Sequence, residues 1–412
     1  MTTTRTGPRA HLVELLAVHE RSLAPGDAVR VARCVAPVLH DGPLLRWRDL
    51  LLRTLELDPT AGRQTHGDLA AVEASLGNYP EALRQVAVAL GDGPVPDRID
   101  ASLRRIEAGA HAMLGQYDDA RASYLRAIDG FRAHGMPLGE TRALRGLAHV
   151  TWAEGRFDEA SSLVDRCLAA WDRIDERRAD GEVAFTRAWW GCARYLHTGD
   201  AEARGWVEEV HARSPALEPH PRAHAERYLA EIRAVDGALD EAEGLTRSFA
   251  DRMGTLGWEH DAETVLARIA LDRWDLDAAG RHAAAALTVR KADDRAAACA
   301  VAASIAQARG DLAAALAHAD QAERLRVGAR DDGHRLSRAL LLVDLGRVAE
   351  AEGLLARSGG LRWCDRRLAA LVEARLAQVR GEEAGALVAQ ALAPDERPWF
   401  GTRLALARVR AG

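Results

Sequence analysis

The sequence has almost no lysine. Of its 55 basic residues only Lys291 is a lysine, and all the others are arginines. A chemistry that needs a positioned amine therefore has one candidate, and the Gly-Lys-Ser/Thr of a P-loop is absent. Gly-x-Ser-x-Gly, Gly-x-Gly-x-x-Gly and His-Glu-x-x-His do not occur either. We expect no cofactor and no catalytic residue, although an acid/base pair assembled across distant segments stays open.

Long apolar runs and paired cysteines are also lacking. The best apolar run, residues 296–303, is far shorter than the ~20 residues of a spanning helix. The five cysteines are scattered without a Cys-x-x-Cys pair, which is typical of reduced thiols. The N-terminus has no apolar segment behind it. These features predict a cytoplasmic protein that no membrane anchors.

The charge is mildly acidic. A net charge of -6 and a pI of about 6.2 do not attract DNA, RNA or an anionic membrane. With 48% hydrophobic and 28% charged residues, the composition is that of an ordinary globular chain and excludes disorder over the whole length. We therefore expect neither nucleic acid nor a membrane as the partner.

The dominant signal is a phrase that recurs along the chain: glycine, any residue, a bulky apolar residue, two mostly acidic or small residues, alanine. Its first residues are Gly77, Gly115, Gly155, Gly199, Gly237, Trp274, Gly310, Gly346 and Gly381, of which the sites at 199, 274 and 381 are degenerate. The spacings are 38, 40, 44, 38, 37, 36, 36 and 35 residues. Such regularity indicates that one structural unit is repeated.

The phrase describes a turn between two helices. The glycine ends one helix in the left-handed conformation, and the acidic residues begin the next. The closing alanine is small enough for the two helix backbones to approach closely. Apolar residues between the turns keep the helical period, for example Leu144 and Leu147, and nothing alternates at period two. The sequence predicts an all-α fold of antiparallel helix pairs.

This pattern resembles the tetratricopeptide-repeat (TPR) family over about residues 61 to 395. The Gly-x-aromatic-x-x-Ala form occurs at Gly77, Gly115 and Gly155, and Tyr124 and Ala127 match second-helix positions of the family. Residues 127–144 are similar to the longer repeats in the sensor arms of large bacterial, actinobacterial-type regulators. The resemblance implies a right-handed α-solenoid of about nine helix pairs whose first helices line a concave groove.

Breaks in the pattern predict three parts. Residues 1–60 are expected to form an N-terminal helical cap or divergent repeats, since Pro25, Pro43 and Pro59 interrupt their helical patterns. Residues 61–395 are the TPR-like repeat array, and residues 396–412 a C-terminal capping helix. The proline-rich residues 214–221 predict a bend.

The groove that the resemblance implies would carry arginine and tryptophan. Helical spacing places the following side chains on stripes of first helices: Arg105, Arg142, Arg145, His149, Trp152, Arg187, Trp189, Trp190, Arg194, His224 and Arg227. Arginine gives paired donors for a carboxylate or phosphate, and tryptophan gives a rigid apolar platform. Of the ten tryptophans, we expect Trp152 and Trp189 to contact a ligand and Trp171 and Trp206 to be packing residues.

Simpler interpretations stand beside this one. Arginines at helical spacing are most often a solvated face, with acids of the same helices as partners. His220 and His224 lie four apart, but no third metal ligand has a clear spacing, so we expect no metal site. Glu259, Asp261 and Glu263 are explained by the dipole at a helix start.

We therefore predict a regulatory or scaffolding protein with an Arg/Trp-lined groove. The groove would bind a protein or peptide that has an acidic or carboxylate group. The alternative is a small-molecule-binding protein or biosynthetic enzyme on the same solenoid, with the groove closed into a pocket. A third interpretation is an oligomerisation module. The sequence leaves the partner and any self-association open.

Overall fold

The computed structural model describes residues 44–57, 62–91, 97–171, 174, 176–213, 219–253, 259–288, 292–325, 332–357 and 365–391, and residues 405, 407, 409 and 410. All regular structure in these ranges is helical, and no strand occurs in them. The chain divides into two compact units, Met1–Arg173 and Ile174–Gly412. The predicted all-α fold is confirmed, and we take each unit by itself.

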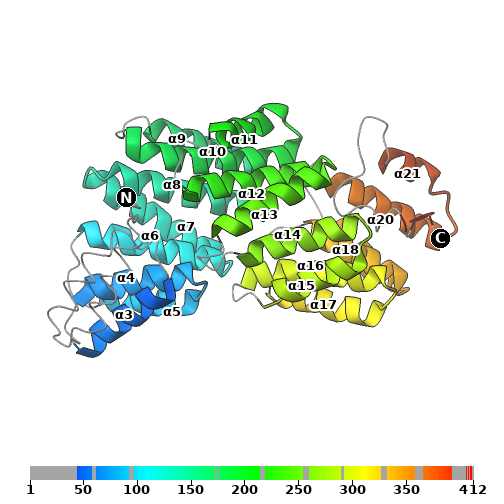
Figure 1. Ribbon diagram of the computed structural model, residues 1–412, viewed down its shortest axis with the longest axis horizontal. Coiled ribbons are helices and arrows are strands. Elements are labelled where there is room, and N and C mark those ends of the chain that lie inside the picture. The colour runs from blue at the N-terminus through cyan, green and yellow to red at the C-terminus, as the bar shows by residue number, and fades with distance from the viewer. Residues whose placement is uncertain are drawn as a thin grey trace, which may run out of the picture. The chain divides into compact units, whose positions relative to one another are not determined.

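Among the described residues, the first unit contains one single helix and three antiparallel pairs (Figure 1). These are α3 (Leu44–Leu57), α4 (Gly62–Ser75), α5 (Tyr79–Leu90), α6 (Asp97–Met113), α7 (Tyr117–Ala133), α8 (Pro137–Ala153) and α9 (Phe157–Trp171). Each helix packs against the next, and α6 also contacts α4 and α8. The first helices of successive pairs are thus neighbours, which is the arrangement of a helical solenoid.

The second unit continues with six more pairs. These are α10 (Glu176–Thr198), α11 (Ala201–Arg213), α12 (Pro219–Val235), α13 (Leu239–Met253), α14 (Glu259–Asp272), α15 (Leu276–Ala286), α16 (Ala292–Ala308), α17 (Leu312–Leu325), α18 (Asp332–Asp344), α19 (Val348–Ala356), α20 (Arg366–Val379) and α21 (Gly385–Ala391). Here too, α10 contacts α12, α14 contacts α16, and α18 contacts α20. The described helices from α4 onward make the nine predicted pairs.

The recurring phrase forms the turn inside each pair. At the third strong copy, Gly155 has a φ of 78°, and the amide of Arg156 donates to the carbonyl of Thr151 over 3.0 Å. This six-to-one bond is the Schellman closure of a helix, and it requires a left-handed residue that glycine adopts without strain. Trp274 takes the same place with a φ of 66° and is the described chain's one non-glycine residue at positive φ.

The alanine of the phrase lets the two helices of a pair approach closely. In the first five strong copies of the phrase, this alanine is 0% exposed, at positions 82, 120, 160, 242 and 315. The degenerate copy at Gly199 has Arg204 in this place. There the close approach comes from Gly191 of α10, where a Cβ would lie 2.7 Å from the carbonyl oxygen of Ala203. The repeat therefore keeps its packing with a different small residue.

At six of the eight places where successive pairs meet, two matched residues lie on the two sides. One partner lies six residues after a turn glycine, and the other lies just before the next turn glycine. We call these two places the junction positions. They hold the following combinations: Leu83 with Leu114, Arg121 with Glu154, Glu243 with Arg273, Gly280 with Arg309, Leu316 with Leu345, and Glu352 with Arg380.

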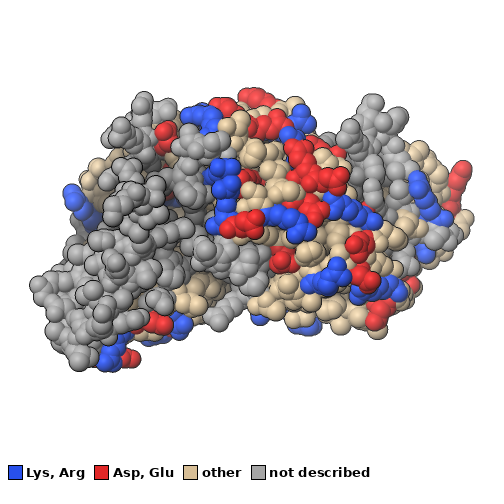
Figure 2. Space-filling view, in the orientation of Figure 1, with Lys and Arg blue, Asp and Glu red and all other residues tan. Residues whose placement is uncertain are grey.

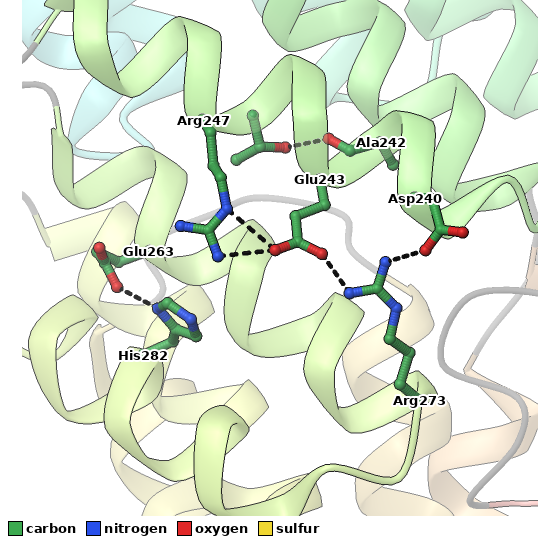
Figure 3. A network of polar contacts seen from close by, with 8 residues as sticks. Asp240, Ala242, Glu243, Arg247, Glu263, Arg273 and His282 are labelled. Atoms are coloured by element: carbon green, nitrogen blue, oxygen red, sulfur yellow. Dashed lines mark hydrogen bonds and ion pairs between the residues drawn. The ribbon is translucent and has the colours of Figure 1, made fainter.

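The ion pairs at the junctions bridge different helix pairs. Figure 3 shows Arg273, which follows α14, reaching back to Glu243 and Asp240 of α13. Glu243 is also held by Arg247, at 2.7 Å. These contacts lower the pKa of Glu243, chiefly through the hydrogen bond from Arg273. Where the earlier position is Gly280, a Cβ would lie 2.9 Å from Arg309 Nη2, so glycine leaves room for the arginine.

Parts of the predicted domain organisation lie outside the described residues. Residues 1–43 and 58–61 do so, as do residues 214–218 of the proline cluster and most of residues 396–412. The boundary between the compact units falls at Arg173, inside the predicted repeat array. The bend at residues 214–221 and the two caps stay predictions.

Candidate functional site

Tyr124 of α7 organises the first-helix face of the first unit. Its side chain is 7% exposed and lies flat against α8, because a Cβ on Gly146 would come within 2.3 Å of its Cζ. Its hydroxyl is 3.6 Å from where a Cβ on Gly109 of α6 would be. Two glycines inside helices therefore make the space that takes this ring, and the hydroxyl lies between α6 and α8.

Two of the predicted arginines act on this phenol. Burial raises the pKa of Tyr124, and the positive charges of Arg105 on α6 and Arg145 on α8 oppose that rise. Both arginines are half-buried. Arg105 and Arg145 thus lie on α6 and α8, the two helices that flank the Tyr124 hydroxyl.

His149 extends this surface along α8. Its side chain is exposed to solvent, yet desolvation lowers its pKa, and the charge of Arg145 lowers it further. Its ring centroid is 5.9 Å from that of Trp152, at an interplanar angle of 54°. His149 is therefore neutral near pH 7 and lies beside an aromatic platform.

Arg142 and Trp152 complete the predicted stripe of α8. Both are half-buried, as expected for side chains at the edge of a helix face. The inner side of the same helix carries Leu144, Leu147 and Ala148, all at most 3% exposed. The period of 3.6 residues separates these two faces, and the first unit has the five predicted residues on the predicted helices.

In the second unit, three of the predicted residues are packing residues of α10 and α12. Trp190 is 1%, His224 3% and Trp189 7% exposed. The Trp189 and Trp190 rings lie 5.6 Å apart at 49°, and His224 packs edge-on against Phe185 at 4.8 Å. Consecutive residues point about 100° apart on a helix, so Trp189 and Trp190 could not both follow one exposed stripe. Helix α10 packs on two sides, and both rings are covered.

The arginines of these helices are held by their own neighbours. Arg194 lies with its guanidinium 5.3 Å from the ring of Trp206 and its Nη2 2.6 Å from Asp200. Arg227 lies 5.8 Å from the ring of Tyr228 and pairs with Glu231. Arg187 is half-buried. Figure 2 shows acidic and basic side chains interleaved over the second unit, which is the solvated face that sequence alone also allowed.

Trp171 and Trp206 differ in their burial. Trp171 is 1% exposed, so it is the packing residue that the sequence predicted. Trp206 is half-buried under Arg194. In the part of the chain that the structure describes, no three residues among His, Cys, Asp and Glu gather as metal ligands. Within the same ranges no helix is long and apolar enough to cross a membrane.

Sequence reasoning missed the functional setting of Tyr124. It identified the residue as a repeat position without the two glycines that receive its ring. The signal was nevertheless present in the spacing. Tyr124 lies nine residues after the turn glycine Gly115, and Gly109 lies six residues before that glycine. Gly146 lies nine residues before the next turn glycine, Gly155. A helix-interior glycine has low helix propensity, so its presence indicates a close approach by another group.

No protein-family model matches the chain, and no curated protein matches it in sequence. Solved structures do match in shape. The Rap conjugation gene regulator of plasmid pLS20, solved in complex with the Phr* peptide, has 13% identity and a TM-score of 0.54 over 77% of this chain and 95% of its own. The chain has a TPR-like helical-repeat fold. Its nine pairs, glycine turns and small-residue contacts are those that the family resemblance implies.

Two other solved TPR-like structures match more loosely. A Rap protein complexed with competence and sporulation factor has 12% identity and a TM-score of 0.42, covering 87% of this chain and 99% of its own. Yeast Tom70 has 13% identity and a TM-score of 0.37, covering 97% and 91%.

Proposed function

We propose that this protein binds a peptide or protein segment on the first-helix face of its first unit, and that an acidic group of the partner lies between Arg105 and Arg145. The observation that supports the proposal is that these two half-buried arginines lie on α6 and α8, the two helices that flank the Tyr124 hydroxyl. Two cations and a hydroxyl donor on neighbouring helices suit a carboxylate, which accepts several charge-assisted hydrogen bonds.

The rest of the α8 face provides contacts beside the acidic group. Trp152 and the neutral His149 present a partly apolar surface, and Arg142 gives a third cation on the same helix. An extended segment can lie along such a helix face with an anchor at one end. The Rap regulator of plasmid pLS20 supports the proposal as a protein of the same fold that was solved with a peptide.

The remaining predictions on function belong to this proposal. A regulatory or scaffolding role follows from binding without a catalytic group of its own. Cytoplasmic location and bacterial origin rest on the sequence, and the buried thiols of Cys167, Cys192 and Cys299 suit a reducing compartment. The binding roles of Arg187 and Arg227 in the second unit stay predictions, and so does the small-molecule alternative.

The test is selection from a random peptide display library on the wild-type protein, followed by affinity measurement on variants. We expect the selected peptides to contain Asp, Glu or a free C-terminus that Arg145→Glu weakens at least tenfold. Arg166→Glu is the matched control, because Arg166 is an exposed arginine of α9 and the substitution changes the net charge equally. Equal affinities for the wild type and Arg145→Glu, or equal losses in both variants, would refute the proposal.

A further inference from the structure

Trp274 differs from the residues at the same place in the other turns of the array. All eight others are glycines at positive φ, whereas Trp274 keeps a φ of 66° with a full side chain. A tryptophan in this left-handed conformation is strained, because its Cβ crowds the following carbonyl. Its side chain is nevertheless 48% exposed, so it does not serve mainly to fill a core. A strained residue that points a large apolar group toward solvent is a candidate for binding.

The backbone that holds Trp274 is rigid. Its amide donates to the carbonyl of Leu271 at 2.9 Å, and the amide of Asp275 donates to the carbonyl of Ala270 at 2.9 Å. The preceding residue, Arg273, binds two carboxylates of α13 (Figure 3). A tryptophan has two side-chain torsions, so on a fixed backbone it loses little conformational freedom when a partner binds. The indole is therefore preorganised as a platform.

Arg309 holds the following side of the same turn. Its Nη2 donates to the carbonyl of Leu276 at 2.7 Å and lies 3.6 Å from the carboxylate of Asp277. Contacts of Arg273 and Arg309 thus join three successive turns into one surface. We call this surface the Trp274 edge and define it as residues 236–240, 273–277 and 309–313.

The Trp274 edge is acidic. Its charged residues are the acids Asp236, Asp240, Asp275, Asp277 and Asp311 and the bases Arg273 and Arg309, which is five negative charges against two positive ones. The side chains of Asp240 and Asp277 are 101% and 91% exposed, so their carboxylates face solvent. Negative charge beside the face of an indole attracts a cation that can contact both.

We propose that the Trp274 edge is a docking surface for a basic segment of a partner protein. An arginine or lysine of the partner stacks on the indole of Trp274, a neighbouring apolar side chain covers the rest of the ring, and the exposed carboxylates pair with the partner's cations. A guanidinium suits this place best, because it stacks on aromatic rings and pairs with carboxylates through two hydrogen bonds.

The charge of this surface disfavours other occupants. Anionic lipid headgroups and the phosphates of a nucleic acid are repelled by an acidic edge. A second copy of the chain, with its net charge of -6, is also disfavoured. The Trp274 edge lies in the second unit, and its partner has the opposite charge to the acidic group proposed for the first unit. The two proposals therefore stand or fall separately.

The experiment selects peptides from a random display library on the wild-type protein, with counter-selection on Trp274→Gly. We expect the selected peptides to contain Arg or Lys beside an apolar residue. Calorimetry with the synthetic peptides should show at least tenfold weaker binding to Trp274→Gly. Trp274→Phe keeps an aromatic face and should bind within about threefold of the wild type. Asp277→Asn removes one exposed charge and should weaken binding about threefold at low salt and less at high salt.

Matched variants separate docking from general effects. Leu125→Ala removes another large apolar side chain, 47% exposed on α7, and should bind as the wild type does. Arg145→Glu should also leave these affinities unchanged. If Trp274→Gly alters the fold, Trp274→Asn is the second variant, because asparagine adopts the left-handed conformation without an aromatic ring and should lose binding equally.

Three results would overturn the proposal. The first is a library without any peptide that distinguishes the wild type from Trp274→Gly. The second is a set of selected peptides that lack basic residues. The third is binding of the wild type to phosphatidylglycerol vesicles, or self-association of the wild type in sedimentation, that Trp274→Gly abolishes, since the indole would then contact a membrane or a second copy.

Discussion

Tyr124 and Ala319 hold the same position in two repeats, nine residues after the turn glycine, and their surroundings are filled differently. In the first, a large ring fills the space and the neighbouring helices have glycine where the ring passes. In the second, Ala319 takes the place of the tyrosine, Ser304 and Ser337 take the places of the two glycines, and a hollow remains. A repeat protein can therefore exchange a packing residue for open space between its helices while the helix pairs themselves are kept.

Tyr124→Ala should have the largest effect on this comparison. Removing a buried aromatic ring from the first unit is expected to lower the free energy of unfolding by about 3–5 kcal/mol, from lost burial and the cavity left behind. Urea denaturation, with hydrogen exchange of α7 and α8 to locate the loss, measures it. Tyr124→Phe should cost at most about 1.5 kcal/mol, because only the hydroxyl is lost. Similar losses in both variants would show that the ring is not the element that fills the junction.

Gly146→Ala should follow in size. The added Cβ would meet the Tyr124 ring at 2.3 Å, so the ring must move at a cost of about 1–3 kcal/mol. Gly353→Ala in α19 is the control, since nothing lies within 4 Å of its Cβ and helix propensity should give a gain of up to about 1 kcal/mol. In the Tyr124→Ala background the cost of Gly146→Ala should disappear. Additive losses would contradict the contact between the two residues.

Trp274→Gly compares the turns of the repeats. Trp274 is 48% exposed and keeps a left-handed backbone that costs a non-glycine residue roughly 1–2 kcal/mol. Glycine at this place, as in the other eight turns, should raise the free energy of unfolding by about 1 kcal/mol in thermal or urea denaturation. A loss of stability would mean that the tryptophan contributes packing that outweighs its strain. Gly346→Trp, the reverse change, should destabilise.

The smallest effect concerns the pH dependence of the junction ion pairs. The pKa of Glu243 is lowered by Arg273 in the folded chain, so it contributes stability that is present above the ordinary carboxyl range and lost as the pH falls through the lowered value. The pair is partly exposed, so the contribution is at most about 1 kcal/mol. Glu243→Gln should therefore lose stability at pH 7 and converge with the wild type at low pH. A constant difference at every pH would exclude the ion pair as its cause.

The sequence was sufficient for the fold because the turn glycine, the closing alanine and the helical period are local and repeat nine times. It was sufficient for the α8 face of the first unit for the same reason, since one helix determines which of its residues share a stripe. It was insufficient for α10 and α12, where Trp189, Trp190 and His224 are covered by neighbouring helices that a single stripe does not reveal. The two Tyr124 glycines and the hollow beside Ala319 depend on three helices at once, and no spacing within one helix predicts them.

The polarity of the junction positions changes along the chain: arginine precedes glutamate at Arg121 and Glu154, whereas glutamate precedes arginine at Glu243 and Arg273. A repeat moved from one unit to the other would place like charges opposite each other or leave a lone charge against leucine. The residues at the junction positions therefore determine which repeats can be neighbours. An array with a repeat deleted or duplicated would have unmatched residues at these positions, although every helix in it could still form.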